Sequence, residues 1–306
     1  SLESGLIEPE EALHALMLTA GTQAAEDRRV PSGSLVPGGA IADHISFGSV
    51  PIFFPGVLDD AENQGGPRWP VPSLDDHYYF VEMAWHVVLA TGRHELLRST
   101  VDGILLIDRL ERAFAVPPVD ECTGLVTCGA QDRGVSFGFT DVVEHTGHLL
   151  FCSILRLQAA RRMADLLQRL GATSDAERYA EIASRIETHL PRVFADTTGL
   201  LRASTGTSAQ RDVWGTAFAV YVGALQGAVA EAACKALAHA LKEGTIAWQG
   251  HIRHVPTDAD FSSESAWEST VTACPKNRYQ NGAYWATPLG WVCFAVAQVS
   301  EDAARE

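Results

Sequence analysis

The stretch Tyr279-Gln280-Asn281-Gly282-Ala283-Tyr284-Trp285 runs directly into an apolar segment that predicts a helix. Three earlier loops rich in glycine and aromatic residues do the same, at residues 65–69, 136–141 and 212–215. Their aromatic positions 69, 137, 214 and 285 are 68, 77 and 71 residues apart. Such a period fits two helices with their connections, so the repeat unit is a helical hairpin. Stacked hairpins place equivalent loops at the same end of a fold.

Apolar residues recur at helical spacing through most of the chain. The pattern predicts eight helices, over residues 9–27, 75–89, 94–114, 142–170, 174–189, 214–225, 229–242 and 289–299. Residues 30–72 are rich in proline and glycine, which indicates irregular chain or short strands. No segment has the composition of a linker. We therefore expect one all-α domain over residues 1–306, with irregular loops over one end.

The composition narrows the classes of ligand. The 306 residues carry a net charge of −15, which argues against nucleic acid and anionic membranes and favours a neutral substrate. No run of 18 uncharged apolar residues predicts a membrane span. The chain opens Ser-Leu-Glu-Ser-Gly, without Met or a signal-like stretch, as in a mature form, a tagged form or a fragment. A cytoplasmic location is favoured, and no cofactor is expected. The protein could form a homo-oligomer.

The cysteines and histidines offer two weaker signals. Cys122 and Cys128 flank a short loop and could close a small disulfide, although all six cysteines reduced is the simpler interpretation. Glu144, His145 and His148 have the spacing of metal ligands, but no further ligand is evident, so no metal site is predicted.

Two carboxyl groups are candidates for acid–base chemistry. Asp141 either caps the helix predicted from residue 142 or, beside aromatic rings that desolvate it, acts as a general acid. Glu268 follows Trp267 in a polar stretch and is the candidate general base, with Glu264 as its rival. In an inverting glycosidase two such groups stand about 6.5–9.5 Å apart.

Aromatic and polar loop residues predict a carbohydrate pocket. Five of the seven tryptophans lie in the last third, mostly in or beside loops, where a ring can stack on a sugar face. Two polar candidates have structural alternatives, since Asp76 could serve a helix dipole and Asn281 a turn. The expected contact residues are Trp69, Asp76, Tyr79, Phe139, Trp214, Trp267, Asn281, Tyr284 and Trp285.

Several motifs together resemble the six-hairpin (α/α)6-barrel glycosidases. They are Trp69-Pro70 with Leu74-Asp75-Asp76-His77-Tyr78-Tyr79-Phe80, Gly138-Phe139-Thr140-Asp141, Asp212-Val213-Trp214-Gly215-Thr216, and Tyr279 to Trp285 with Gly290-Trp291. The resemblance to trehalases, processing α-glucosidases and glucosylglycerate hydrolases implies an inverting glycoside hydrolase. Asp141 then matches the region of their acid and Glu268 that of their base. Thr140 departs from the acid motif, and eight helices instead of twelve imply a barrel that lacks N-terminal helices.

Two other functions remain open on the same fold. A sugar epimerase or polysaccharide lyase would use His145, His148 or Tyr284 as its base. An anionic substrate would then need arginines, for which Arg68, Arg211 and Arg278 are available. The third possibility is a carbohydrate-binding protein without catalysis.

Overall fold

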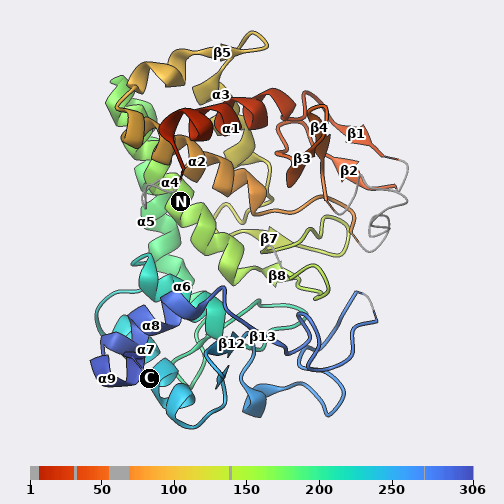
Figure 1. Cartoon of the computed structure of the whole chain (residues 1–306), viewed down its shortest axis with the longest axis vertical. Helices are drawn as coiled ribbons and strands as arrows, with labels where there is room; N and C mark the ends of the chain where they lie inside the picture. Colours follow the sequence, from red (N-terminus) through yellow and green to blue (C-terminus); the bar gives the residue numbers. More distant parts are fainter. Residues whose placement is uncertain (1–6, 31–32, 55–68, 138–139, 272, 306) are drawn as a thin grey trace. The chain divides into compact units, whose positions relative to one another are not determined.

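The computed structural model describes residues 7–30, 33–54, 69–137, 140–271 and 273–305. These residues contain nine α-helices, joined by loops with short antiparallel strands (Figure 1). The helices are α1 (Pro9–Thr22), α2 (Asp76–Thr91), α3 (Leu106–Ala115), α4 (Leu150–Leu170), α5 (Thr173–Val193), α6 (Val213–Tyr221), α7 (Gly227–Lys242), α8 (Leu289–Ala297) and α9 (Glu301–Arg305). None of the described helices is long and apolar enough to cross a bilayer.

The strands form five two-stranded hairpins and one three-stranded sheet within the described ranges. The hairpins pair β1 (Arg28–Arg29) with β2 (Leu35–Val36), β3 (His44–Ser46) with β4 (Val50–Ile52), β5 (Thr100–Val101) with β6 (Ile104–Leu105), β7 (Thr127–Cys128) with β8 (Gly147–His148), and β9 (Leu201–Arg202) with β10 (Arg211–Asp212). The sheet has the order β11 (Ala247–Trp248), β12 (His251–Arg253), β13 (Tyr284–Trp285).

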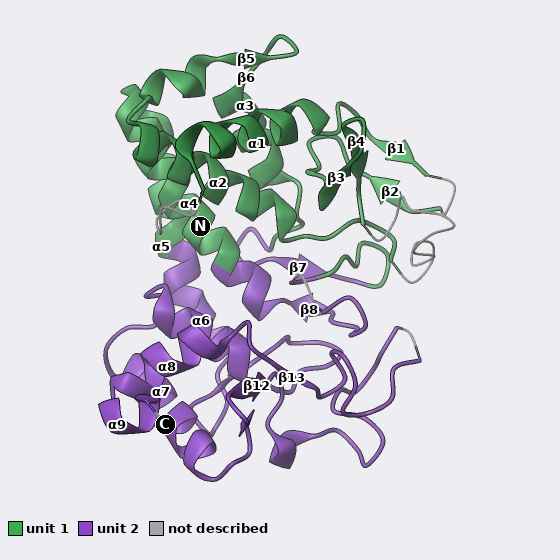
Figure 2. Ribbon diagram, in the orientation of Figure 1, with its two compact units in different colours: residues 1–119, 130–135, 155–184 green, residues 120–129, 136–154, 185–306 purple. Residues whose placement is uncertain are grey.

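The chain divides into two compact units, and each unit is built from three separate stretches of the sequence (Figure 2). Unit 1 comprises residues 1–119, 130–135 and 155–184, and unit 2 comprises residues 120–129, 136–154 and 185–306. Helices α4 and α5 each contribute residues to both units. The expectation of one domain stays a prediction.

Most predicted helices are confirmed, and local signals explain their limits. Glu8 and Glu11 form a capping box at the start of α1, with Pro9 in its first turn. Gly92 ends α2 in the left-handed conformation, with φ +65°. Helix α5 continues to Val193, past its predicted end at residue 189, with Pro191 inside the helix. The short helix α9 was not expected.

Two predicted helices are wrong over part of their length. Residues 94–114 form the 3₁₀ helix η1 (His94–Arg98), the β5–β6 hairpin and only then α3. The hairpin turn uses left-handed Asp102 (φ +48°) and Gly103 (φ +78°), which a continuous helix excludes. The helix expected from residue 142 begins at Leu150, because Gly147 (φ +75°) and His148 pair with β7 instead.

In unit 2 the helices and the loops occupy different sides. Figure 1 shows α6, α7, α8 and α9 gathered on one side and the long loops with β12 and β13 on the other. Beneath these loops lies a small core of Val142, Val143, Ala203, Val255, Ala266 and Trp267. This core supports the two loops that carry Asp141 and Glu268.

Candidate active site

Asp141 lies in a tight turn of unit 2. The Thr140 side chain closes this turn by donating from Oγ1 to the Phe137 carbonyl, at 2.7 Å. The Val143 amide donates to the Thr140 carbonyl, at 3.0 Å. Helix α4 starts only at Leu150, so the interpretation of Asp141 as a helix cap is wrong. Asp141 is nevertheless 6% exposed, and a carboxyl group this shielded needs another explanation.

Antiparallel pairing joins the Asp141 segment to the Glu268 segment. Val143 pairs with Thr270, and the Glu144 amide donates to the Ser269 carbonyl at 3.1 Å. In an antiparallel pair the residues that precede the two segments lie at opposite ends. Asp141 and Glu268 therefore flank a pairing of three residues and lie four residue steps apart along it, which is roughly 13 Å. Their carboxyl groups reach the spacing of an inverting pair only if both side chains turn towards the middle.

Glu268 is exposed and held by the backbone. Its Oε2 accepts a hydrogen bond from the Ser208 amide at 2.8 Å, and Ser208 is left-handed with φ +59°. Its rival Glu264 is also exposed, and accepts instead from the neighbouring Ser263 hydroxyl. The contact with Ser208 fixes the direction of the Glu268 carboxylate. Among the described residues, the hydrogen bonds of Glu264 stay within its own loop.

Tyr279 lies against Asp141, and the sequence did not single it out within its loop. Its hydroxyl is hydrogen-bonded to the Asp141 side chain. Burial, followed by this hydrogen bond, raises the pKa of the Tyr279 hydroxyl above its usual range. The Trp285 indole nitrogen donates to the Tyr279 carbonyl at 3.2 Å, and the two rings meet edge to face at 5.3 Å. Asp141, Tyr279 and Trp285 thus form one contiguous cluster.

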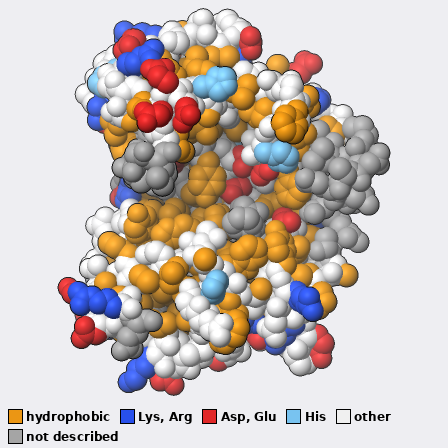
Figure 3. All heavy atoms as spheres, in the orientation of Figure 1, with side chains coloured by type: hydrophobic (Ala, Val, Ile, Leu, Met, Phe, Trp, Pro, Cys, Tyr) orange, Lys and Arg blue, Asp and Glu red, His pale blue; other side chains and the backbone are white. Residues whose placement is uncertain are grey.

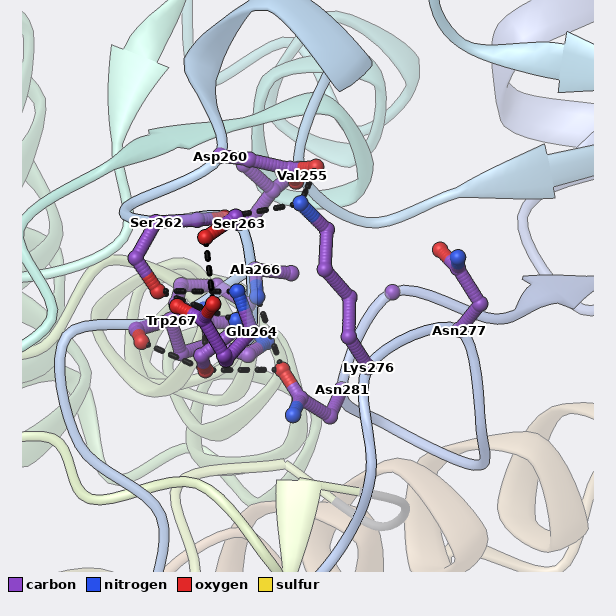
Figure 4. Close-up of polar contacts among 12 residues, drawn as sticks. Val255, Asp260, Ser262, Ser263, Glu264, Ala266, Trp267, Lys276, Asn277 and Asn281 are labelled. Atoms are coloured by element: carbon purple, nitrogen blue, oxygen red, sulfur yellow. Dashed lines mark hydrogen bonds and ion pairs between the residues drawn. The ribbon is translucent and has the colours of Figure 1, made fainter.

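A buried ionic network holds the loop that bears Tyr279 and Trp285. Arg253, fully buried, donates to Asp260 at 2.6 Å and to the Gly282 carbonyl at 2.7 Å. The Lys276 ammonium also contacts the Asp260 carboxylate, at 2.6 Å (Figure 4). Two charged side chains from one strand and one loop therefore meet at a single carboxylate, which fixes the distance between these segments.

Asn281 has a structural role in this loop. Its Oδ1 accepts from the Ala266 amide at 2.8 Å, and its Nδ2 donates to the Cys274 carbonyl at 2.7 Å. It is 2% exposed, and the left-handed residue of the turn is Gly282, at φ +92°. Both polar atoms of the Asn281 amide are thus bonded to protein, so the residue braces the loop from inside.

The predicted aromatic contact residues of unit 2 lie at two depths. Trp214 and Trp267 are fully buried, while Tyr284 and Trp285 are half-buried. Trp214 stacks on the His254 ring at 4.4 Å, and its edge meets Trp285 at 6.3 Å. Tyr284 and Trp285 therefore offer ring surface to a ligand, whereas Trp214 supports Trp285 from below.

Three predicted contact residues belong to unit 1. Trp69 is 1% exposed and lies under the Arg133 guanidinium, whose carbon is 5.6 Å from the ring centroid. Asp76 and Tyr79 line a cavity of about 220 Å³ together with Asp43 and His44. Burial, followed by the charges of Asp75 and Asp43, raises the pKa of Asp76 well above its ordinary value. The remaining predicted contact, Phe139, lies outside the described residues.

The histidines of the alternative functions have other partners. His145 is 5% exposed, and its ring meets Trp267 edge to face at 5.0 Å. Burial, followed by the charge of His254, lowers the pKa of His145 to about 3. His148 contacts Asp120 at 3.0 Å. The His145 Nδ1 atom is hydrogen-bonded to the Ser136 hydroxyl, at 3.1 Å. No group of three or more His, Cys, Asp or Glu among the described residues could hold a metal ion.

The sequence also gave no hint of one pair. Asp212 and His254 are both buried, with Oδ1 and Nε2 3.0 Å apart. Asp212 belongs to the quoted Asp-Val-Trp-Gly motif, which is the signal that could have drawn attention to it. The two residues are 42 positions apart, which hides the pairing from any local pattern.

Comparison with known proteins gives a structural relationship. No protein-family model matches the sequence, and no curated protein matches it. The GH63 mannosylglycerate hydrolase from Thermus thermophilus, solved in complex with glucose, aligns over 99% of this chain and 79% of its own, with 13% identity and a TM-score of 0.54. A family 105 glycoside hydrolase from C. acetobutylicum aligns over 75% of this chain and 68% of its own, at 13% identity and a TM-score of 0.43.

An α-L-rhamnosidase from Aspergillus terreus aligns over 56% of this chain at 13% identity, with a TM-score of 0.36. The aligned part is 19% of the rhamnosidase, so this chain corresponds to a small part of that enzyme. At such identity the full-length match to the mannosylglycerate hydrolase shows the fold alone. The chain has a six-hairpin glycosidase-like fold, shared with glycoside hydrolases.

Proposed function

We propose that this protein is an inverting glycoside hydrolase that acts on a small neutral glycoside. The observation that carries the proposal is the shielded carboxyl of Asp141, bonded to Tyr279 beside Trp285, on a fold shared with glycosidases. A carboxyl group in such a setting is suited to hold and deliver a proton, while flat rings suit the apolar face of a sugar.

The roles of the two carboxyl groups follow from their surroundings. Protonated Asp141 gives its proton to the glycosidic oxygen as the bond to the anomeric carbon breaks. Glu268, exposed and oriented by the Ser208 amide, takes a proton from the water that attacks the anomeric carbon from the opposite face. The product then has the inverted configuration, and the two carboxyl groups must approach to within about 6.5–9.5 Å in the complex.

In unit 2, the proposed sugar contacts are the accessible aromatic residues Tyr284 and Trp285. In unit 1, Asp76 and Tyr79 are proposed as sugar contacts of the cavity that they line there. The remaining predicted contacts have supporting roles, because they are buried beneath the accessible rings or brace their loop: Trp214, Trp267 and Asn281. Trp69 lies under Arg133. A neutral substrate is consistent with the net charge of −15. On the face shown in Figure 3, the Lys and Arg side chains of the described residues lie beside Asp and Glu and form no basic patch there.

Substitution of the two carboxyl groups tests the assignment. We expect Asp141→Asn and Glu268→Gln each to lower kcat/KM by about 10²–10⁴-fold, since each removes one proton transfer. The substrates are a panel of aryl glycosides, disaccharides and mannosylglycerate, and proton NMR of the first product reports its anomeric configuration. Glu264→Gln, four residues from Glu268, is the matched control and should keep its activity. Full activity in Asp141→Asn would overturn the assignment.

A carbohydrate-binding protein without catalysis is the second candidate. The observation that favours it is the position of Asp141 and Glu268 at opposite ends of their pairing. In that case the panel is not hydrolysed, yet glucose raises the melting temperature. Wild-type turnover with release of free sugar excludes this candidate.

A further inference from the structure

Tyr279 adopts a backbone conformation that bulky residues avoid. Its φ is +43°, in the left-handed region that is unfavourable for a residue with a Cβ. The conformation is held from two sides, because the Trp285 indole and the Ala283 amide both donate to the Tyr279 carbonyl at 3.2 Å. Glycine would relieve the strain, so tyrosine at this position indicates a use for its side chain.

The side chain directs its hydroxyl at Asp141. The ring is fixed against Trp285, and Tyr279 as a whole is 40% exposed, which leaves it at the accessible side of the loop. We propose that Tyr279 is the positioning residue of Asp141: its hydroxyl donates to one carboxyl oxygen, so that the other oxygen carries the proton and faces the glycosidic bond. This inference rests on the proposed function.

The hydrogen bond serves both stages of the proton transfer. While Asp141 is protonated, a donor on one oxygen leaves the other as the site for the proton, which fixes the direction of delivery. After the transfer, the same donor stabilises the carboxylate that remains. Among the described residues, the titratable groups that act on the Tyr279 hydroxyl are Asp141 and Cys274.

The first test is the pH dependence of hydrolysis in Tyr279→Phe. Loss of a hydrogen bond to a carboxylate raises the pKa of that group by about one unit, because the charged form loses a stabilising donor. The limb of kcat/KM at high pH, where the general acid loses its proton, should therefore move up by about one pH unit, with kcat lowered about tenfold and KM little changed. Tyr221→Phe, on the exposed surface of α6, is the control and should leave the profile in place. An unmoved limb in Tyr279→Phe contradicts the proposal.

The second test does not require activity. In protein labelled with ¹³C at the aspartate carboxyl carbons, the Asp141 resonance is identified by its loss in Asp141→Asn. Its titration midpoint should rise by about one unit in Tyr279→Phe and stay in place in Tyr221→Phe. An unchanged midpoint in Tyr279→Phe overturns the proposal, whatever the kinetics show. A raised midpoint in a protein that hydrolyses nothing supports the contact and counts against the glycosidase function instead.

Discussion

At the scale of single residues, Gly282 shows how one backbone conformation sets the shape of the proposed site. Its φ of +92° turns the chain between Asn281 and Tyr284, and its carbonyl accepts from Arg253. The space where a Cβ would lie is filled by the Arg253 guanidinium. A side chain at this position would thus strain the backbone and displace a buried charge.

Replacement of Gly282 by alanine should therefore be costly. We expect Gly282→Ala to lower the free energy of unfolding by roughly 2 kcal/mol or more, because alanine is strained at positive φ and displaces Arg253 from Asp260. Gly290→Ala in α8 is the matched control, since no atom lies within 4 Å of its Cβ position. There, alanine should be neutral or stabilising by about 0.5–1 kcal/mol. Urea unfolding measures both, and equal values for the two variants would contradict the explanation.

At the scale of elements, the start of α6 joins a local signal to a tertiary contact. Asp212 caps the helix by accepting from the Gly215 amide at 2.6 Å, and the same oxygen lies 3.0 Å from His254 Nε2. The cap is a local property that the Asp-Val-Trp-Gly sequence favours. His254 lies between β12 and the 3₁₀ helix η3 (Thr257–Ala259), a segment that comes close to Asp212 only when the unit folds.

The cap and the charge of Asp212 can be separated by two substitutions. Asp212→Ala should cost about 1–2 kcal/mol of stability, because the first turn of α6 loses its acceptor. Asp212→Asn keeps an oxygen acceptor and removes only the charge, so its loss should be smaller. Both are measured by urea unfolding followed by tryptophan fluorescence. If Asp212→Asn loses more unfolding free energy than Asp212→Ala, the contact with His254 outweighs the cap.

At the scale of the whole molecule, each unit encloses a neutral histidine. Burial lowers the pKa of His77 in unit 1 to about 4, and burial with the charge of His254 lowers that of His145 in unit 2 to about 3. Both pKa values lie below the ordinary histidine pKa of about 6.5, so an unfolded chain takes up these protons before the folded chain does. Acid should therefore destabilise both units.

We expect the free energy of unfolding to keep its full value above pH 6.5 and to decrease as the pH falls below it. The contribution of His77 is lost down to about pH 4, and that of His145 down to about pH 3. At pH 4 each histidine should cost roughly 3 kcal/mol. Asparagine can mimic the Nδ1 contacts, so His77→Asn and His145→Asn should each remove about one proton taken up on unfolding between pH 4.5 and 6. His14→Asn, at the exposed surface of α1, is the control. The measurement is the unfolding free energy at several pH values across this range. If its slope against pH is the same in the wild type and in the variants, the explanation is contradicted.

The sequence by itself determined the helices that have strong apolar periodicity and the recurrence of aromatic loops. These depend on residues a few positions apart, which a local pattern contains. The sequence wrongly predicted helix over residues 94–105 and 142–149. The apolar spacing there is also helical, but glycines at 103 and 147 permit hairpins instead.

Only the tertiary structure decided what the candidate residues contact. Pairing of Val143 with Thr270 brought the Asp141 and Glu268 segments together, freed Asp141 from a helix end and placed it against Tyr279. Burial divided the tryptophans into Trp285, which a ligand can reach, and Trp214 and Trp267, which it cannot reach in this conformation. The physical reason is that both results depend on contacts between residues distant in the sequence, and such contacts form only when the chain packs.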